Sequence, residues 1–233
     1  MNNPFSNEPI TYTELAEALS ISKDSYHKKT LQKNMDSHSQ IKDAYLFSSR
    51  LKYFINTKKN IKILDCGCGL GFIARGLKKY KNFEVFLSEP SDSIKKIIED
   101  VYPEDNFLPF SIEDLPKKFH NFFDVIYLRE VYPFTRTSDI DLQDQLIKAI
   151  SLHLKEDGVL IFEQIKNEKD LFCNLKALNL DYKIFYLMPV KWLNFEWFYK
   201  IYFKVHFLSI FIRLIYKVFN KKINHFIVIK KIK

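Results

Sequence analysis

The chain has 233 residues, of which 47% are hydrophobic and 16% aromatic. This composition supports one sizeable folded domain and excludes disorder over most of the length. Three cysteines, Cys66, Cys68 and Cys173, are too few for a disulfide framework, so a reducing, cytoplasmic setting is expected. The first residues, MNNPFSNEPI, lack the basic and apolar regions of a signal peptide.

The formal net charge of +8 is concentrated in the C-terminal fifth of the chain. Residues 183–233 contain eleven Lys or Arg and one acid, Glu196, which gives a local charge of +10. Residues 1–182 therefore contain 25 basic and 27 acidic residues and sum to −2. Only five of the 36 basic residues are Arg, which base and phosphate recognition favours, so nucleic acid is not the expected partner.

Residues 1–56 have a helical pattern and are expected to form a cap outside the main domain at 57–233. The stretch TYTELAEALSISKDSYHKK opens with a capping-box spacing and looks like the first two helices of a helix-turn-helix. Asp24 and Tyr26 occupy the face that would have to be basic for DNA recognition, so a cap over a cofactor is favoured. His27 and His38 lie in this segment, and either is a candidate base.

Between about residues 60 and 165 the pattern alternates between strands and helices. Runs rich in Ile, Val, Phe and Tyr predict strands at IKILDC, FEVFLSE, FFDVIYL and GVLIFEQ. Helices are predicted at GFIARGLKKY, SDSIKKIIEDVY and DIDLQDQLIKAISLHLK. Near-continuous apolar strands alternating with helices indicate a parallel sheet covered on both faces. YKIFYLM then predicts a further strand, followed by an aromatic helix at about 192–222 and a last strand at NHFIVIKKIK.

The stretch ILDCGCGLGF, residues 63–72, holds three of the five glycines of the chain. A dinucleotide-binding loop has the spacing G-x-G-x-x-G, whereas here Phe72 takes the place of the last glycine. Asp65 would repel a pyrophosphate but suits a ligand that carries a positive ammonium and sulfonium. Glycines at alternate positions let the loop wrap closely around a ribose or an amino-acid moiety.

Glu89 lies twenty residues after Gly69, at the end of the second predicted strand. An acid at this place in an open α/β sheet can accept hydrogen bonds from both hydroxyls of a ribose. The alternative is that Glu89 only caps the following helix.

DCGCGLG followed by LSEPS resembles the class I S-adenosylmethionine-dependent methyltransferases. In this resemblance Asp65, Gly67, Gly69 and Gly71 match the first motif of the family, and Glu89 matches its ribose-binding acid. The segment SIEDLP is similar to the family's G-D-A-E-D-L-P stretch, which implies that Ile112 and Glu113 lie near the adenine. Ser111 stands where the family often has an acid, so Glu113 or Asp114 is expected to hold the adenine amino group instead.

The resemblance covers roughly residues 60–165 and implies an α/β, Rossmann-like class I methyltransferase fold. Such a fold has a seven-stranded, mostly parallel sheet with helices on both faces and an antiparallel last strand, and it uses S-adenosyl-L-methionine as donor. FFDVIYLREVYPF and LKEDGVLIFEQ look like its fourth and fifth strand segments. The fourth segment lacks the [DN]-P-P-[YFW] signature of enzymes that methylate exocyclic or amide nitrogens, which argues against adenine or glutamine acceptors.

Methyl transfer from an activated donor requires alignment and, for a hydroxyl acceptor, a base. Candidates are expected at the carboxyl end of the fourth strand, where open sheets bind ligands. Glu130 is the first choice as base or substrate orienter, with Tyr132 beside it and Arg129 as an anchor for an anionic acceptor. The alternative is that these residues only pack or solvate a loop.

The remaining reactive side chains give no further site. None of the six histidines pairs with another ligand at metal spacing, and His153, on a predicted helix, is expected at the surface. Cys66 and Cys68 are interpreted as small fillers, and Cys173 lies away from any strand end.

The C-terminal helical pattern has an apolar face and a basic half that also contains aromatic residues. The apolar face consists of Ile201, Val205, Leu208, Ile212, Ile215 and Phe219. The segment is too charged to span a bilayer. Three interpretations remain: a helix packed on the sheet that lines the acceptor pocket, an interfacial helix on an anionic membrane, or a dimerisation surface.

The sequence thus predicts an S-adenosylmethionine-dependent methyltransferase that acts on a small-molecule or saccharide hydroxyl. One alternative acceptor is a membrane lipid or a quinone precursor, presented at the basic helix. A second alternative is a donor-binding regulator that contacts DNA through the N-terminal segment. The expected location is the cytoplasm, or the periphery of the inner face of the membrane, and a homodimer is compatible with the pattern.

Overall fold

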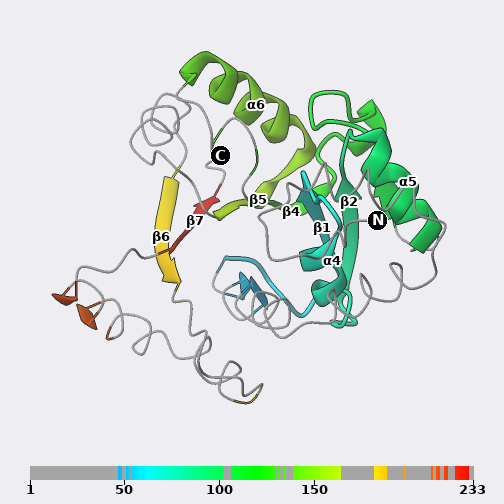
Figure 1. The fold of residues 1–233 in the computed structure, drawn as a ribbon. Coiled ribbons are helices and arrows are strands. Elements are labelled where there is room, and N and C mark those ends of the chain that lie inside the picture. Colours follow the sequence, from blue (N-terminus) through cyan, green and yellow to red (C-terminus); the bar gives the residue numbers. More distant parts are fainter. Residues whose placement is uncertain are drawn as a thin grey trace.

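The computed structural model describes part of the chain, and its centre is a seven-stranded sheet in the order β3-β2-β1-β4-β5-β7-β6 (Figure 1). The described residues are 47–48, 51–52, 54–101, 106–129, 131, 134, 139–163, 181–187, 197, 211, 214–215, 218–219 and 224–230. The strands are β1 Ile61–Cys66, β2 Phe83–Ser88, β3 Asn106–Leu108, β4 Phe123–Arg129, β5 Leu154–Glu163, β6 Asp181–Leu187 and β7 Asn224–Lys230.

The strand directions confirm the predicted fold class. β1 pairs in parallel with β2 and β4, β2 with β3, and β4 with β5. β7 runs antiparallel to both β5 and β6. The last strand of the sequence is therefore the antiparallel one, and β6 points the same way as β5. The three-residue β3 is too short to stand out among the apolar runs of the sequence.

The helices between the strands are α4 Phe72–Leu77, α5 Asp92–Val101 and α6 Ile140–His153, and a 3-10 turn, η1, spans Lys117–Phe119. α6 begins where Asp139 accepts a hydrogen bond from the backbone N–H of Leu142 at 3.0 Å, which satisfies one of the free N–H groups of the first turn. α5 buries three isoleucines at helical spacing, Ile94, Ile97 and Ile98.

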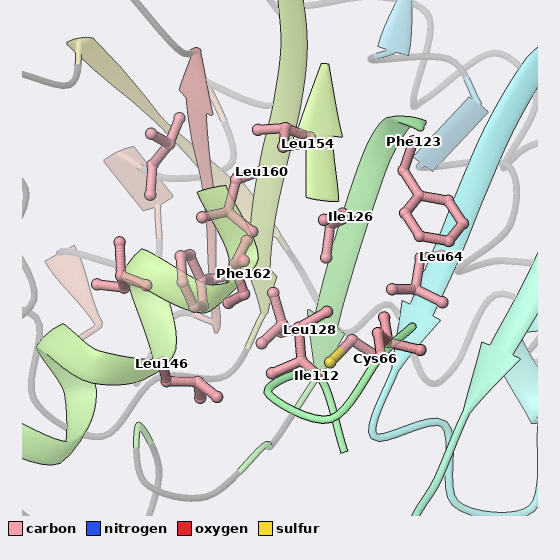
Figure 2. Close-up of a cluster of buried hydrophobic side chains, with 14 of the residues drawn as sticks. Leu64, Cys66, Ile112, Phe123, Ile126, Leu128, Leu146, Leu154, Leu160 and Phe162 are labelled. Carbon is pink, nitrogen blue, oxygen red and sulfur yellow. The ribbon is translucent and has the colours of Figure 1, made fainter. Parts of the chain in front are cut away.

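One face of the sheet carries the main hydrophobic core. Alternate residues of the central strands point to this face, and Figure 2 shows pairs from β1, β4 and β5 doing so. The labelled strand pairs are Leu64 and Cys66, Ile126 and Leu128, and Leu160 and Phe162. Leu146, Ile147 and Ile150 of α6 cover them. Both faces of the central strands are thus buried, as predicted, and this explains why their sequences are almost continuously apolar.

The opposite face carries α4 and the polar side chains near the strand ends. The register pairs Asp65 of β1 with Tyr127 of β4, and Arg129 of β4 with Glu163 of β5. Register partners in a sheet share a face, and so do residues two apart on one strand. All four side chains therefore lie on the same face, at or near the carboxyl ends of three neighbouring strands.

His153 corrects one expectation from the sequence, because it is buried with 2% of its surface exposed. Its Nδ1 lies 3.2 Å from the carbonyl oxygen of Phe119, and its ring packs edge-on against that of His120. The last turn of α6 runs directly into β5, so the residue that joins them is enclosed rather than solvated.

The predicted N-terminal cap, residues 1–56, lies largely outside the described residues, and so does most of the helix predicted at about 192–222. From the first segment, Phe47 and Leu51 are described as buried, and the ring of Phe47 meets that of Tyr127 edge-on at 5.2 Å. A contact between the N-terminal segment and the polar face of the sheet is thereby established. Cys173, His27, His38 and His206 also lie outside the described residues.

Candidate functional site

The loop between β1 and α4 is a tight turn built on three glycines in the left-handed region. Gly67, Gly69 and Gly71 have φ values of 67°, 52° and 72°. A side chain at Gly67 would place its Cβ 2.9 Å from Cγ2 of Val131, which is closer than real Cβ contacts come. The clustering of glycine in the sequence is therefore required by backbone conformation and by close approach to the segment after β4.

Hydrogen bonds fix this loop to the end of β2. The carbonyl of Ser88 accepts the N–H groups of Gly67 and Cys68, at 2.8 and 3.1 Å. The N–H of Gly71 donates to the carbonyl of Cys68 at 3.0 Å, which closes the turn just before α4. The loop is consequently held between the carboxyl ends of β2 and β4.

Glu89 lies directly after β2 and faces the same loop. Its Oε2 accepts the N–H of Gly69 at 3.1 Å, and its Oε1 accepts the N–H of Ser91 at 3.3 Å. Burial raises the pKa of Glu89, and these two hydrogen bonds oppose the rise. An ionised carboxylate has about four acceptor positions, so two remain for a ligand.

Asp65 is a buried carboxylate with 3% of its surface exposed. Its Oδ2 accepts the N–H of Ala74, in the first turn of α4, at 3.2 Å. Burial raises its pKa to about 7, although the Ala74 hydrogen bond and the charge of Arg129 lower it. Desolvation raises the pKa of Asp65 by more than the favourable contacts lower it. A positive charge on a nearby ligand would lower the pKa again.

A second buried acid, Glu163, lies at the carboxyl end of β5. It accepts a short hydrogen bond from the hydroxyl of Tyr127, and its Oε1 is 4.0 Å from Nε of Arg129. The Arg129 side chain is 33% exposed, whereas that of Glu163 is 3% exposed. The carboxylate of Glu163 thus lies beside Nε of the guanidinium, while part of the Arg129 side chain is exposed to solvent. Among the described residues, the site contains three carboxylates and one guanidinium, which favours a ligand with positive charge.

Residues 36–209 match the family described as a methyltransferase domain, Methyltransf_23, and this match covers about three quarters of the chain. The chain belongs to this methyltransferase family. Sequence comparison with curated proteins finds no match.

The methyltransferase also has the fold of solved class I enzymes. It is similar to the plantazolicin methyltransferase BpumL in complex with SAH, with a TM-score of 0.55, 14% identity, and coverage of 95% of this chain and 99% of that chain. It is similar to a protein from Galdieria sulphuraria described as a sarcosine dimethylglycine methyltransferase, with a TM-score of 0.54, 14% identity, and coverage of 81% and 84%. The methyl donor is S-adenosylmethionine.

The residues at the strand ends fit this donor. The three left-handed glycines leave alternate positions of the loop without side chains, and Glu89 keeps free acceptor positions beside it. The buried carboxylate of Asp65 lies behind the loop, where the positive charge of the donor would offset its desolvation. When bound, the donor supplies an activated methyl group on a sulfonium. The protein's contribution is to hold it and to align an acceptor.

The two predicted adenine contacts differ in environment. Ile112 is buried at 3% exposure and lies beside Cys66 and Leu128 in the hydrophobic core (Figure 2). Glu113 is exposed, next to Asp114, whose carboxylate accepts a hydrogen bond from the Ser111 hydroxyl at 2.7 Å. Their roles in adenine binding remain predictions.

Two of the three catalytic candidates, Glu130 and Tyr132, lie outside the described residues, and their roles also remain predictions. The third, Arg129, ends β4 and belongs to the buried polar group described above. Cys66 is buried in the core, and burial raises the pKa of its thiol and of that of Cys68. Both thiols are therefore poor nucleophiles, as a filler role requires.

Sequence reasoning missed Glu163, Tyr127 and Val131. Glu163 ends the apolar run GVLIFE in the way that Glu89 follows FEVFLS, and that parallel is a usable signal. Tyr127 carries no such signal, because an aromatic residue inside a strand is common in any core. Among the described residues, no group of three His, Cys, Asp or Glu side chains could hold a metal ion.

Proposed function

We propose that this methyltransferase transfers the methyl group to a hydroxyl of a small-molecule or saccharide acceptor, and that Arg129 anchors an anionic group of that acceptor. The observation that carries the proposal is the partly exposed guanidinium at the carboxyl end of β4, with its inner edge beside the buried Glu163. Arg presents donors in a planar fork that suits carboxylate or phosphate.

The position of Arg129 relative to the donor loop supports this role. Two residues further along the chain, Val131 packs against Gly67, so the segment after β4 borders the loop that would hold the donor. An acceptor anchored at Arg129 would therefore lie at the edge of the sheet where the methyl group is presented. Glu130 and Tyr132, the proposed base and its neighbour, flank Val131 in the sequence.

The similar structures are named for different acceptors, plantazolicin on one side and sarcosine and dimethylglycine on the other. The fold alone therefore does not select an acceptor. The sequence REVYPF at 129–134, which lacks the nitrogen-methylating signature, favours oxygen over an amide or exocyclic nitrogen.

The test is transfer of labelled methyl from S-adenosylmethionine into an extract of host cells that lack the protein, followed by separation into small-molecule, polysaccharide, lipid and RNA fractions. We expect label in the small-molecule or polysaccharide fraction. Arg129→Gln should reduce that label at least about tenfold while donor binding falls by much less, because the substitution removes the proposed acceptor contact directly and reaches the donor site only through the lost charge near Asp65 and Glu163. Lys148→Gln, an exposed cation on α6, is the matched control and should leave the label unchanged. Equal labelling by wild type and Arg129→Gln would refute the anchoring role, and label in RNA alone would refute the acceptor class.

A lipid acceptor is the second candidate, favoured by the exposed apolar side chains between residues 211 and 219. Label confined to the lipid fraction would select it.

A further inference from the structure

The segment that joins β6 to β7 exposes large apolar side chains. Trp197, Phe211, Leu214, Val218 and Phe219 are between 50% and 79% exposed, and Ile215 is 37% exposed. Figure 1 shows the described residues of this segment, in orange, apart from α4, α5 and α6 and away from β1. These side chains are therefore not used to line the sheet.

Five of these residues lie on one face of a helix. Residues 211, 214, 215 and 218 are helical, and the N–H of Phe219 donates to the carbonyl of Ile215 at 3.1 Å. At about 100° per residue, the side chains at 211, 214, 215, 218 and 219 fall within an arc of about 140°. The exposed groups form a continuous stripe, which we call the apolar stripe, rather than scattered surface residues.

The sequence around the apolar stripe is basic throughout. Residues 197–222 contain six Lys or Arg and no Asp or Glu. The basic residues are Lys200, Lys204, Arg213, Lys217, Lys221 and Lys222. An apolar helical face within a purely basic segment is the pattern of a helix that lies in the interface of an anionic bilayer.

We propose that the apolar stripe docks this methyltransferase on a membrane surface that contains anionic phospholipids. Acyl chains cover the stripe, and the lipid phosphates neutralise the surrounding lysines and arginine. No helix among the described residues has the length and hydropathy to cross a bilayer. The six Lys or Arg between residues 197 and 222 oppose a spanning helix and favour one that lies on the surface.

Other partners fit less well. A second copy that docked through the same segment would bring together two segments that each contain six basic residues and no acid. Single-stranded RNA would use aromatic platforms, whereas three of the five residues of the stripe, Leu214, Ile215 and Val218, are aliphatic and cannot stack on bases.

The topology places this docking segment at the same edge of the sheet as the donor loop. β6 is parallel to β5, and Leu187 at the end of β6 pairs with Asn224 at the start of β7. The chain thus leaves the sheet and returns to it at the edge where β1, β4 and β5 end. Docking through the stripe would hold this edge close to the bilayer.

Co-sedimentation of the full chain with vesicles tests the proposal. With an equal mixture of phosphatidylcholine and phosphatidylglycerol, the protein should pellet at low salt, and high salt should weaken binding at least severalfold through screening. Phosphatidylcholine alone should bind it at least about tenfold more weakly, because the charge contribution is lost.

The variant Val218→Ser with Phe219→Ser removes the two most exposed side chains of the stripe. We expect its binding to mixed vesicles to fall at least about tenfold, from the apolar area no longer buried in the bilayer. The matched control is Leu152→Ser, which removes an exposed leucine, 57% exposed, from α6 and should bind as wild type does. Binding of S-adenosylhomocysteine by calorimetry should be unchanged in all three proteins, which shows that they are folded.

Three results would overturn the proposal. The first is a wild-type protein that stays in the supernatant with mixed vesicles at low salt. The second is a double serine variant that pellets as strongly as wild type. The third is a wild-type dimer in light scattering that the double serine variant converts to a monomer, because the stripe would then be covered by a second copy.

Discussion

The two edges of the sheet differ in what they bury. At the carboxyl edge, β1 and β5 enclose Asp65 and Glu163, and their carboxylates face a single guanidinium. At the amino edge, near the start of β4, the buried His153 packs edge-on against His120 and lies within hydrogen-bond distance of the carbonyl of Phe119, whose ring stacks on that of Phe123. The first edge holds charge that costs stability until a ligand offsets it, and the second uses its polar atoms in internal hydrogen bonds.

Gly67→Ala should give the largest effect on the carboxyl edge. It forces a side chain into a left-handed conformation, which costs about 1 to 2 kcal/mol, and places a Cβ 2.9 Å from Val131. The loop would have to move away from the segment after β4. We expect the affinity for S-adenosylhomocysteine, measured by calorimetry, to fall at least about a hundredfold.

Gly158→Ala, in β5, is the matched substitution outside the loop. Its new Cβ would approach Leu154 and the carbonyl of Lys155 at 2.8 Å, so it should lower the melting temperature through overpacking. The folded fraction should bind S-adenosylhomocysteine with wild-type affinity. If Gly158→Ala weakens binding as much as Gly67→Ala does, the two edges are not functionally separate.

Asp65→Asn should lower the affinity for the donor and raise the stability of the fold. The folded-state pKa of Asp65, about 7, lies above its ordinary value of 3.8, so the folded state binds more protons between these values. The stability of the wild type is therefore greatest below this range and falls as the pH rises towards about 7. The amide removes that loss, on the order of 2 to 4 kcal/mol, while it can still accept the N–H of Ala74.

Urea unfolding at about pH 5 and about pH 8 measures the difference between Asp65→Asn and wild type, which should favour the variant more at the higher pH. Donor affinity should fall at least about tenfold, since the negative charge behind the loop is lost. Asp124→Asn is the control at the amino edge, where Asp124 pairs with Lys155 at 2.8 Å. This control should lose stability and keep donor affinity. If Asp124→Asn instead keeps its stability and loses donor affinity, Asp124 and not Asp65 serves the donor.

The contrast between the edges also explains how far sequence reasoning reached. Gly67, Gly69 and Asp65 are neighbours in the sequence, so local chemistry was enough to predict a donor loop, and apolar runs were enough to predict β1, β2, β4 and β5. The pairing of Glu163 with Tyr127 depends on the register of β4 and β5, which no local pattern encodes. His153 was misjudged for a similar reason, because its burial follows from a direct passage of α6 into β5.

Glu163→Gln should affect the acceptor side more than the donor side. The amide can still accept the Tyr127 hydroxyl hydrogen bond, but it removes the charge beside Arg129. A guanidinium that is less firmly held should misplace the acceptor, and we expect methyl transfer in extract to fall about tenfold or more. Donor affinity should stay within about threefold. Glu156→Gln, an exposed acid at the start of β5, is the control, and equal effects from both variants would contradict a specific role for Glu163.

His153→Gln should have no effect on ligand binding, and it should make the stability of the fold less dependent on pH. Burial, together with the charge of His120, lowers the pKa of His153, while the carbonyls of Phe119 and Ile112 oppose the shift. The unfolded chain therefore binds a proton more readily, and wild-type stability falls as the pH drops below about 6.5. Glutamine cannot be protonated, so urea unfolding should show a smaller loss between about pH 8 and about pH 5 than in wild type. Because the residue lies at the edge away from the donor loop, S-adenosylhomocysteine binding should not change at either pH, and a change there would mean that the amino edge also takes part in ligand binding.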